Sequence, residues 1–173
     1  DYVRCGLDDL AMPLHRAAVA DTAALQRAGG RNFTDEHRGP ITSWQEFETY
    51  PWPDPARAST RSLEWLSEHL PEGMCIIGSG GFAHFCEYLS WLPGYETLCY
   101  LLYDQRDLVQ AIAERLIEIF RVSLQRMLAF ERVKIVWGSD DMGFRSGTLI
   151  NPADLREFVL PGHHGRPNRG RGY

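Results

Sequence analysis

The sequence predicts an α/β fold with a parallel sheet, because two short apolar runs alternate with amphipathic helical segments. The runs are Met74–Ile77 and Val133–Trp137, and each ends at a polar loop that contains glycine, as buried parallel strands do. This order of strand, helices and strand favours parallel pairing through right-handed crossovers. With 173 residues, 44% of them apolar, the chain can form one domain with a substantial core.

The N-terminal third contains one predicted helix and a loop-rich stretch. A third strand is possible near Asp1–Val3, and helix-forming residues then dominate Leu10–Ala28, with Gly29 and Gly30 as a stop. The following loop contains one short helix, for which Ser43 and Glu46 form a capping box. We therefore expect few regular elements between the first helix and residue 55.

The remaining segments predict a succession of helices around the two strands. Apolar residues at spacings of three and four predict a helix in Arg57–Leu70, and Pro71 and Gly73 end it. Three further helices and a helix start with an asparagine cap follow along the chain. They are Phe82–Leu92, Tyr95–Tyr103, Asp107–Phe130 and the start at Asn151–Pro152.

Composition and charge exclude several classes of protein. The formal net charge is −5, so the chain as a whole has no basic surface for nucleic acid or for an anionic membrane. No apolar run approaches the roughly 20 residues that span a bilayer. The four cysteines (Cys5, Cys75, Cys86 and Cys99) form no CxxC pair and no disulfide or zinc framework. We therefore expect a reducing, cytoplasmic compartment.

The C-terminal end breaks the pattern of the rest of the chain. We expect one domain over residues 1–161, followed by an unpatterned tail over 162–173, GHHGRPNRGRGY, which is rich in Gly and Arg. Two adjacent histidines, His163 and His164, lie in this tail, and we expect solvated tail residues there rather than metal ligands. We expect the natural protein to continue past Pro161, with the tail arising from truncation, a shifted reading frame or an expression artefact.

Asp140 and Asp141 are the first candidates for chemistry, because they follow a buried strand directly. Ligands bind at the carboxyl ends of parallel strands, where adjacent acids can share a proton or stabilise charge. Consecutive residues of an extended segment point in opposite directions. We therefore expect one inward and one outward acid, and a solvated acidic loop is the alternative.

Three further side chains are weaker candidates. Tyr88 either contacts a substrate or packs in a helix, and Arg145 either binds a substrate carboxylate in bidentate fashion or stays solvated. His84 is either an acid–base group or a polar residue at a helix start. The glycine-rich turn of residues 78–81 matches no phosphate-binding motif, and tight-turn geometry accounts for its glycines.

The chain between Asp21 and Pro161 resembles the uroporphyrinogen decarboxylase family, taken broadly to include its corrinoid-dependent methyltransferase relatives. The resemblance rests on three pieces in the same order and spacing. They are GRNFTDEHRGPITSWQEFETYPWPDP (Gly30–Pro55), GGFAHFCEYLSWLPGYETLCYLLYD (Gly80–Asp104) and GSDDMGFRSGTLINPADLREFVLP (Gly138–Pro161). Members of this family are (β/α)₈ barrels longer than this chain, so the resemblance implies a partial (β/α)₈ TIM barrel.

The resemblance also implies roles for particular residues. Gly80 and Tyr88 keep the spacing between a turn glycine and an active-site tyrosine of the decarboxylases, although Phe82 and Ala83 depart from the family's turn. Asp140 and Asp141 match the acidic strand end. The implied activity is removal of carboxylates from the acetate arms of a tetrapyrrole, a small-molecule substrate, without a cofactor. A carboxylate would stabilise the positive charge on a protonated pyrrole.

Two other readings are open at this point. The methyltransferase relatives use zinc and a corrinoid, and their His-x-Cys pair and later Cys normally lie downstream of the part of this chain that resembles the family, so the zinc ligands of that position are not present. A non-catalytic barrel fragment that binds a ligand or partner through its Trp- and Pro-rich loops is the third hypothesis. The sequence carries no signal for a particular oligomeric state.

Overall fold

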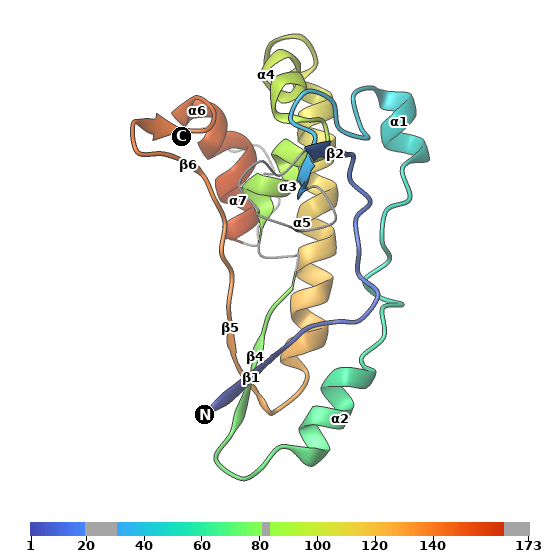
Figure 1. Cartoon of the computed structure of the whole chain (residues 1–173), viewed down its shortest axis with the longest axis vertical. Helices are drawn as coiled ribbons and strands as arrows, with labels where there is room; N and C mark the ends of the chain where they lie inside the picture. Colours follow the sequence, from blue (N-terminus) through green and yellow to red (C-terminus); the bar gives the residue numbers. More distant parts are fainter. Residues whose placement is uncertain (20–30, 81–83, 165–173) are drawn as a thin grey trace.

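A computed structural model describes residues 1–19, 31–80 and 84–164 and contains a small parallel sheet with helices (Figure 1). The sheet has three strands in the order β1 (Tyr2–Cys5), β4 (Cys75–Gly78) and β5 (Val133–Val136), and both pairings are parallel. The predicted α/β class, the parallel sheet and the third strand at the N-terminus are confirmed. The sheet is open, and the barrel stays a prediction.

Helices pack on one face of this sheet and above it, and each described helix follows an apolar pattern in the sequence. The helices are α1 (Trp44–Thr49), α2 (Arg61–His69), α3 (Phe85–Trp91), α4 (Tyr95–Asp104), α5 (Arg106–Leu128), α6 (Pro152–Asp154), the π-helical turn Leu155–Val159 and α7 (Leu160–His163). None of them is long and apolar enough to cross a membrane, within the part of the chain that is described. The expected start of α3 at Phe82 lies outside the described residues.

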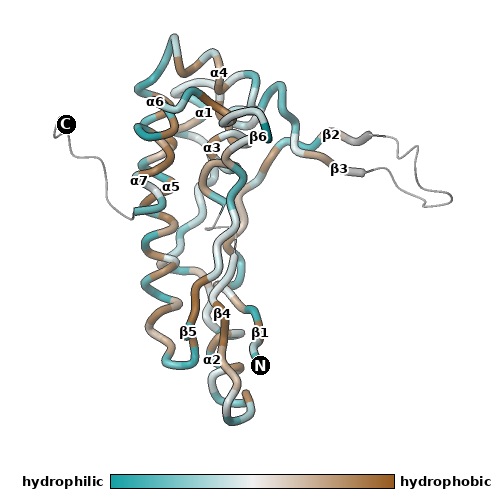
Figure 2. The backbone as a smooth tube through the Cα atoms, turned by 90° about the vertical axis from the view of Figure 1, so that its left-hand side faces the viewer, coloured by the Kyte–Doolittle hydropathy of each residue, from teal (hydrophilic) through white to brown (hydrophobic). Residues whose placement is uncertain are grey.

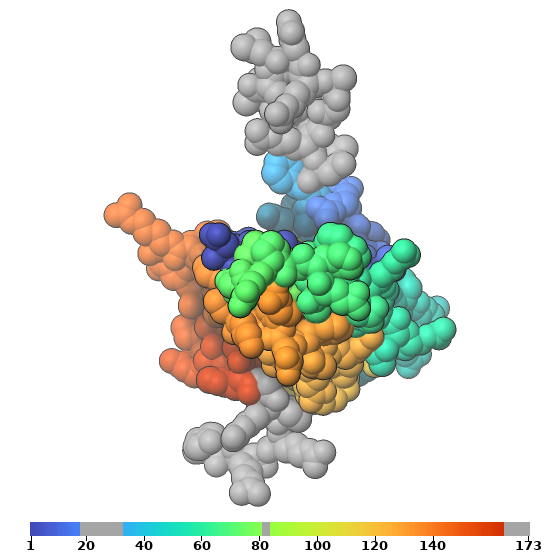
Figure 3. All heavy atoms as spheres, turned by 90° about the horizontal axis from the view of Figure 1, so that it is seen from below, coloured from blue at the N-terminus to red at the C-terminus, as the bar shows by residue number. Residues whose placement is uncertain are grey.

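The helix-facing side of the sheet forms a small core. Ile76 on β4 pairs with Val133 on β5, and both side chains are buried against Leu63 of α2 and Met127 of α5. The register shifts after this pair, so that Ile77 pairs with Ile135. Because successive residues of β4 point to opposite faces, Ile77 and Ile135 lie on the other face of the sheet. Figure 2 shows the apolar character of β4 and β5, and Figure 3 shows the lower end, where α2 and the ends of the strands meet.

The larger core lies between the helices. Along α5 the apolar residues Leu108, Ile112, Leu116 and Ile119 recur at spacings of three and four, and all are at most 1% exposed. They pack with α3, α4 and the segment from α6 to α7. Leu128, at the end of α5, is 54% exposed, so the predicted apolar stripe is buried over most but not all of its length.

The predicted helix over Leu10–Ala28 is wrong where the structure describes it. Residues 10–15 have no regular secondary structure, and Arg16–Val19 forms β2, which pairs antiparallel with β3 (Arg31–Thr34). Tertiary contacts outweigh the helical propensity of these residues. The carbonyl of Pro13 accepts a hydrogen bond from the hydroxyl of Tyr50, at 2.8 Å. Residues 20–28 of the predicted helix lie outside the described residues.

The capping prediction for α1 is confirmed in part. The hydroxyl of Ser43 accepts a hydrogen bond from the backbone N–H of Glu46 at 3.3 Å, as an N-cap does. In a capping box the carboxylate of Glu46 would accept from the N–H of Ser43, but here it bonds the preceding residue. It accepts hydrogen bonds from the backbone N–H and the hydroxyl of Thr42, both at 2.7 Å.

The segment after β5 contains a hairpin and a continuous helical run. Strands β6 (Gly143–Phe144) and β7 (Gly147–Thr148) form a two-stranded hairpin where the sequence predicted a plain loop. The expected helix start is confirmed, because the side chain of Asn151 accepts a hydrogen bond from the N–H of Ala153 at 2.9 Å. The run extends through the π-helical turn into α7, so residues 162 and 163 belong to the folded body, whereas 165–173 lie outside the described residues.

Candidate functional site

The carboxyl ends of the three parallel strands meet at one edge of the sheet. Ser79, which follows β4, donates its backbone N–H to the carbonyl of Cys5 at 2.9 Å, and Trp137, after β5, donates to the carbonyl of Gly78 at 2.8 Å. A Cβ atom on Gly6 would lie 2.1 Å from the carbonyl oxygen of Ser79. Only glycine allows the ends of β1 and β4 to approach so closely.

Asp140 follows β5 in the chain, and its side chain contacts the start of α3. Its carboxylate accepts hydrogen bonds from the backbone N–H of Cys86 at 2.7 Å and of Glu87 at 3.1 Å. The first turn of a helix has N–H groups without an intrahelical partner, and a carboxylate satisfies them. The side chain of Asp140 is only 4% exposed. Its negative charge is therefore held in a fixed position below the protein surface.

His163 reaches the same carboxylate from α7. Its Nε2 lies 3.0 Å from Oδ2 of Asp140, and its side chain is 33% exposed. An ionised carboxylate only accepts, so Nε2 carries the hydrogen of this bond. The preceding Gly162 packs directly on the ring of Phe85, where a Cβ atom would come within 2.5 Å. This close contact places the imidazole beside the carboxylate.

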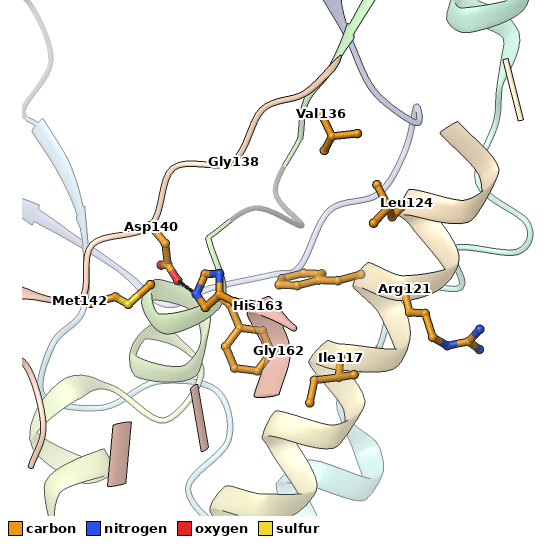
Figure 4. Close-up of a pocket in the computed structure, with 11 residues that line it drawn as sticks. Ile117, Arg121, Leu124, Val136, Gly138, Asp140, Met142, Gly162 and His163 are labelled. Atoms are coloured by element: carbon orange, nitrogen blue, oxygen red, sulfur yellow. Dashed lines mark hydrogen bonds and ion pairs between the residues drawn. The ribbon is translucent and has the colours of Figure 1, made fainter. Parts of the chain in front are cut away.

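A cavity of about 460 Å³ lies next to this pair (Figure 4). It lies between the end of β5, the middle of α5 and α7, and most of its walls are apolar. The guanidinium of Arg121 points away from the pair and binds the carboxylate of Glu118 at 2.7 and 3.0 Å. The lining residues are Phe85, Ile117, Phe120, Arg121, Leu124, Val136, Gly138, Asp140, Met142, Gly162 and His163.

A second histidine and carboxylate pair lies at the start of α3. Nδ1 of His84 lies 2.5 Å from the carboxylate of Glu87. The backbone N–H of the same Glu87 donates a hydrogen bond to Asp140. Between the two pairs, burial and the neighbouring acids, chiefly Asp140, raise the pKa of the Cys86 thiol to about 12. The thiol stays protonated near neutral pH and is not a nucleophile there.

The two adjacent acids have separate environments, as expected for one inward and one outward residue. Asp141 is exposed, and its carboxylate accepts a hydrogen bond from the N–H of Gly143 within its own loop, at 3.1 Å. Arg145 is also exposed, in the turn between β6 and β7. Gly80 follows β4 at a φ of 153°, a conformation that favours glycine. Asp141, Arg145 and Gly80 are not among the residues that line the cavity.

Tyr88 lies in the helical core beside the cavity rather than in its wall. Its ring makes edge contacts with Trp91 at 5.3 Å and with Phe120 at 6.3 Å between centroids. Burial raises the pKa of its hydroxyl above the ordinary value of 10. The structure therefore has the packing arrangement that the sequence offered as the alternative, and a substrate role for Tyr88 stays a prediction.

The sequence did not identify His163 and Glu87 as partners in this site. Asn151 marks the start of a helix, and apolar residues at Leu155, Phe158 and Val159 continue its buried face. Extending that period by one turn would have placed His163 near the core. Within residues 1–19, 31–80 and 84–164, no group of three or more His, Cys, Asp or Glu side chains is arranged to hold a metal ion.

Comparisons with protein-family models, with curated proteins and with solved structures found no match to this chain. The site is therefore interpreted from its own geometry. A buried carboxylate fixed by a helix start, an imidazole bonded to it and an adjoining apolar cavity can bind a small molecule and exchange protons with it.

Proposed function

We propose that the chain forms part of a (β/α)₈-barrel decarboxylase of the uroporphyrinogen decarboxylase type. The enzyme would remove carboxylates from the acetate arms of a tetrapyrrole in the cytoplasm, without a cofactor. The main support for this proposal is the position of Asp140. Its carboxylate is fixed at the carboxyl end of a parallel strand, the edge at which barrel enzymes hold their active sites, and beside a cavity.

The open face of the sheet supports a barrel. The face away from the helices and the outer edge of the sheet expose Tyr2, Ile135 and Trp137 to between 49% and 58%. Arg4 covers part of this surface, with its guanidinium 5.6 Å from the centre of the Trp137 ring. Further strands paired to β1 and β5 would close the sheet and enclose these side chains.

The cavity supports the choice of chemistry. Its volume of about 460 Å³ falls within the range of small-molecule sites. The apolar walls lower the local dielectric and so strengthen the effect of the Asp140 charge on a neighbouring cation. A protonated pyrrole is such a cation, and it accepts the electrons of the breaking carbon–carbon bond, so the substrate itself supplies the electron sink.

The test compares the two adjacent acids in the full-length protein. We expect Asp140→Asn to lower kcat on uroporphyrinogen by about 100-fold or more, because preorganised charge is a large part of catalysis. The matched control Asp141→Asn should stay within about twofold, since that carboxylate bonds only its own loop. Mass spectrometry of the oxidised porphyrin products counts the carboxylates lost.

Two results would overturn this assignment. One is the absence of any decarboxylated product from folded wild-type protein. The other is an equal effect of the two substitutions, which would mean that the fixed position of Asp140 has no catalytic value. A parallel reaction with zinc, a methylated corrinoid and a thiol acceptor detects the methyltransferase chemistry instead.

A further inference from the structure

We infer that His163 is a catalytic residue of this cavity and transfers a proton to the substrate, with Asp140 as its positioning residue. For its reaction this inference rests on the proposed decarboxylase function. Loss of CO₂ from an acetate arm breaks a carbon–carbon bond, and its electron pair passes into the protonated pyrrole, which leaves a methylene carbon joined to the ring by a double bond. The ring releases its added proton once the methylene carbon has taken one up. That carbon needs a proton to become a methyl group, and a side chain at the cavity must deliver it.

The hydrogen bond to Asp140 prepares the imidazole for this task. Because Nε2 donates to the carboxylate, the second nitrogen, Nδ1, is left to exchange a proton. Among the described residues none forms a hydrogen bond with Nδ1. In Figure 4 this nitrogen points away from Asp140. The geometry is that of an acid–base group held in one orientation by a buried carboxylate.

An aromatic ring and solvent flank the imidazole of His163. Its imidazole lies 6.1 Å from the ring of Phe85 between centroids, with the planes tilted by 60°. The side chain is one-third exposed, so a molecule in the cavity can reach it and solvent can return its proton. The other titratable residues in the cavity wall are Asp140, 3.0 Å from the imidazole, and Arg121, whose charge is paired with Glu118.

The transfer balances in atoms and electrons. The N–H bond at Nδ1 of the imidazolium breaks, its electron pair stays on the ring, and a C–H bond forms at the methylene carbon. The carboxylate leaves as CO₂, and water returns one proton to Nδ1 for each carboxylate removed. The hydrogen bond to Asp140 keeps the ring in the same orientation before and after the transfer.

Two substitutions at His163 and one control test the inference in the full-length protein. His163→Gln retains an N–H donor for Asp140 but cannot transfer a proton, so we expect kcat to fall by about 100-fold or more, with KM within a few-fold of wild type. His164→Gln changes the adjacent exposed histidine, for which no side-chain contact is described, and should leave both constants within about twofold.

The second substitution separates catalysis from folding. His163→Ala leaves space beside the cavity, and added imidazole should restore at least a tenth of the lost activity with a saturable dependence on its concentration. Wild-type activity with an unaffected His163→Gln variant would overturn the role of His163 and leave the proposed function standing. Lost activity without rescue would also overturn it. Absence of decarboxylation by the wild type would overturn both.

Discussion

The helical layer and the sheet of this molecule differ in how completely they bury their apolar residues. Helix α5 is covered by α3, α4 and the run from α6 to α7, and its stripe around Leu116 is fully enclosed. The sheet buries a cluster of Leu63, Ile76, Met127 and Val133 on its helix-facing side. On the other face Ile77 of the central strand is 6% exposed, but Ile135 of the edge strand is 49% exposed. The helical layer therefore buries most of its apolar side chains, whereas one face of the sheet leaves large apolar side chains exposed.

This difference follows from the range of the contacts. An amphipathic helix buries its stripe against neighbours that lie close in the sequence, so α3, α4 and α5 complete each other within a short stretch. A parallel strand needs partners on both edges and cover on both faces. The candidate site lies where the two regions meet, with Asp140 supplied by the sheet side and His163 by the helical side.

The largest expected effect is a loss of stability in the helical layer. Leu116→Ala should lower the free energy of unfolding by about 2–5 kcal/mol, because the side chain is fully buried and leaves a cavity. The same substitution at Leu128 of the same helix should cost less than about 0.5 kcal/mol, because that side chain is 54% exposed. Urea unfolding measures both, and equal losses would contradict the described core.

Ile135→Ala tests whether the sheet is as open in solution as it is described. The proposed barrel encloses Ile135, so we expect its truncation in the full-length protein to cost about 2 kcal/mol or more. A sheet face left in water would give a loss below about 0.5 kcal/mol. The smaller value, measured by urea unfolding, would contradict the barrel and keep the contrast between the two regions.

The elements that the sequence predicted are those with local signals. The strands β4 and β5, the helices α2 to α5 and the caps at Ser43 and Asn151 follow from apolar periodicity and capping chemistry. The helix expected near residue 10 failed, because the hydrogen bond from Tyr50 to Pro13 and the pairing of β2 with β3 depend on distant residues. Propensity alone contains no information about such partners.

The sequence predicted the acidic part of the candidate site but not its histidine. Asp140 and Asp141 followed from their place after a strand, and the alternation of side chains predicted one inward and one outward acid without deciding which is which. His163 could not be ranked, because its importance comes from a bond across 23 residues and from the close packing of Gly162 on Phe85. The glycine-rich composition around it predicts disorder when tertiary contacts are ignored.

Replacement of Asn151 tests the helix that brings His163 to the site. Asn151→Ala removes the acceptor of the Ala153 N–H and should cost about 1 kcal/mol in unfolding free energy. Ser43→Ala removes a longer, 3.3 Å cap from α1, which buries no residue, and should cost about 0.5 kcal/mol. Thermal unfolding ranks the two caps, and a larger loss at Ser43 would contradict the greater burial of the C-terminal run.

The smallest expected effect is a pH-dependent one at Glu46, at the edge of the helical layer. The hydroxyl and N–H of Thr42, and then the guanidinium of Arg38, lower the pKa of this carboxyl from 4.5 to about 2. A depressed pKa stabilises the folded state above pH 4.5, and that contribution is lost as the pH falls towards 2. Because the side chain is one-third exposed, solvent screening limits the contribution to about 1 kcal/mol or less.

Glu46→Gln should therefore be less stable than wild type at pH 7 and approach it as the pH falls from 4.5 to 2. The exposed Glu48, on the same helix, provides the matched control, since no hydrogen bond to its side chain is described and Glu48→Gln should change little at any pH. Urea unfolding at a series of pH values gives both curves. A stability difference for Glu46→Gln that stayed constant below pH 4.5 would mean that its carboxylate charge does not stabilise the fold. The contact with Thr42 would then act as a hydrogen bond that does not depend on the carboxylate charge.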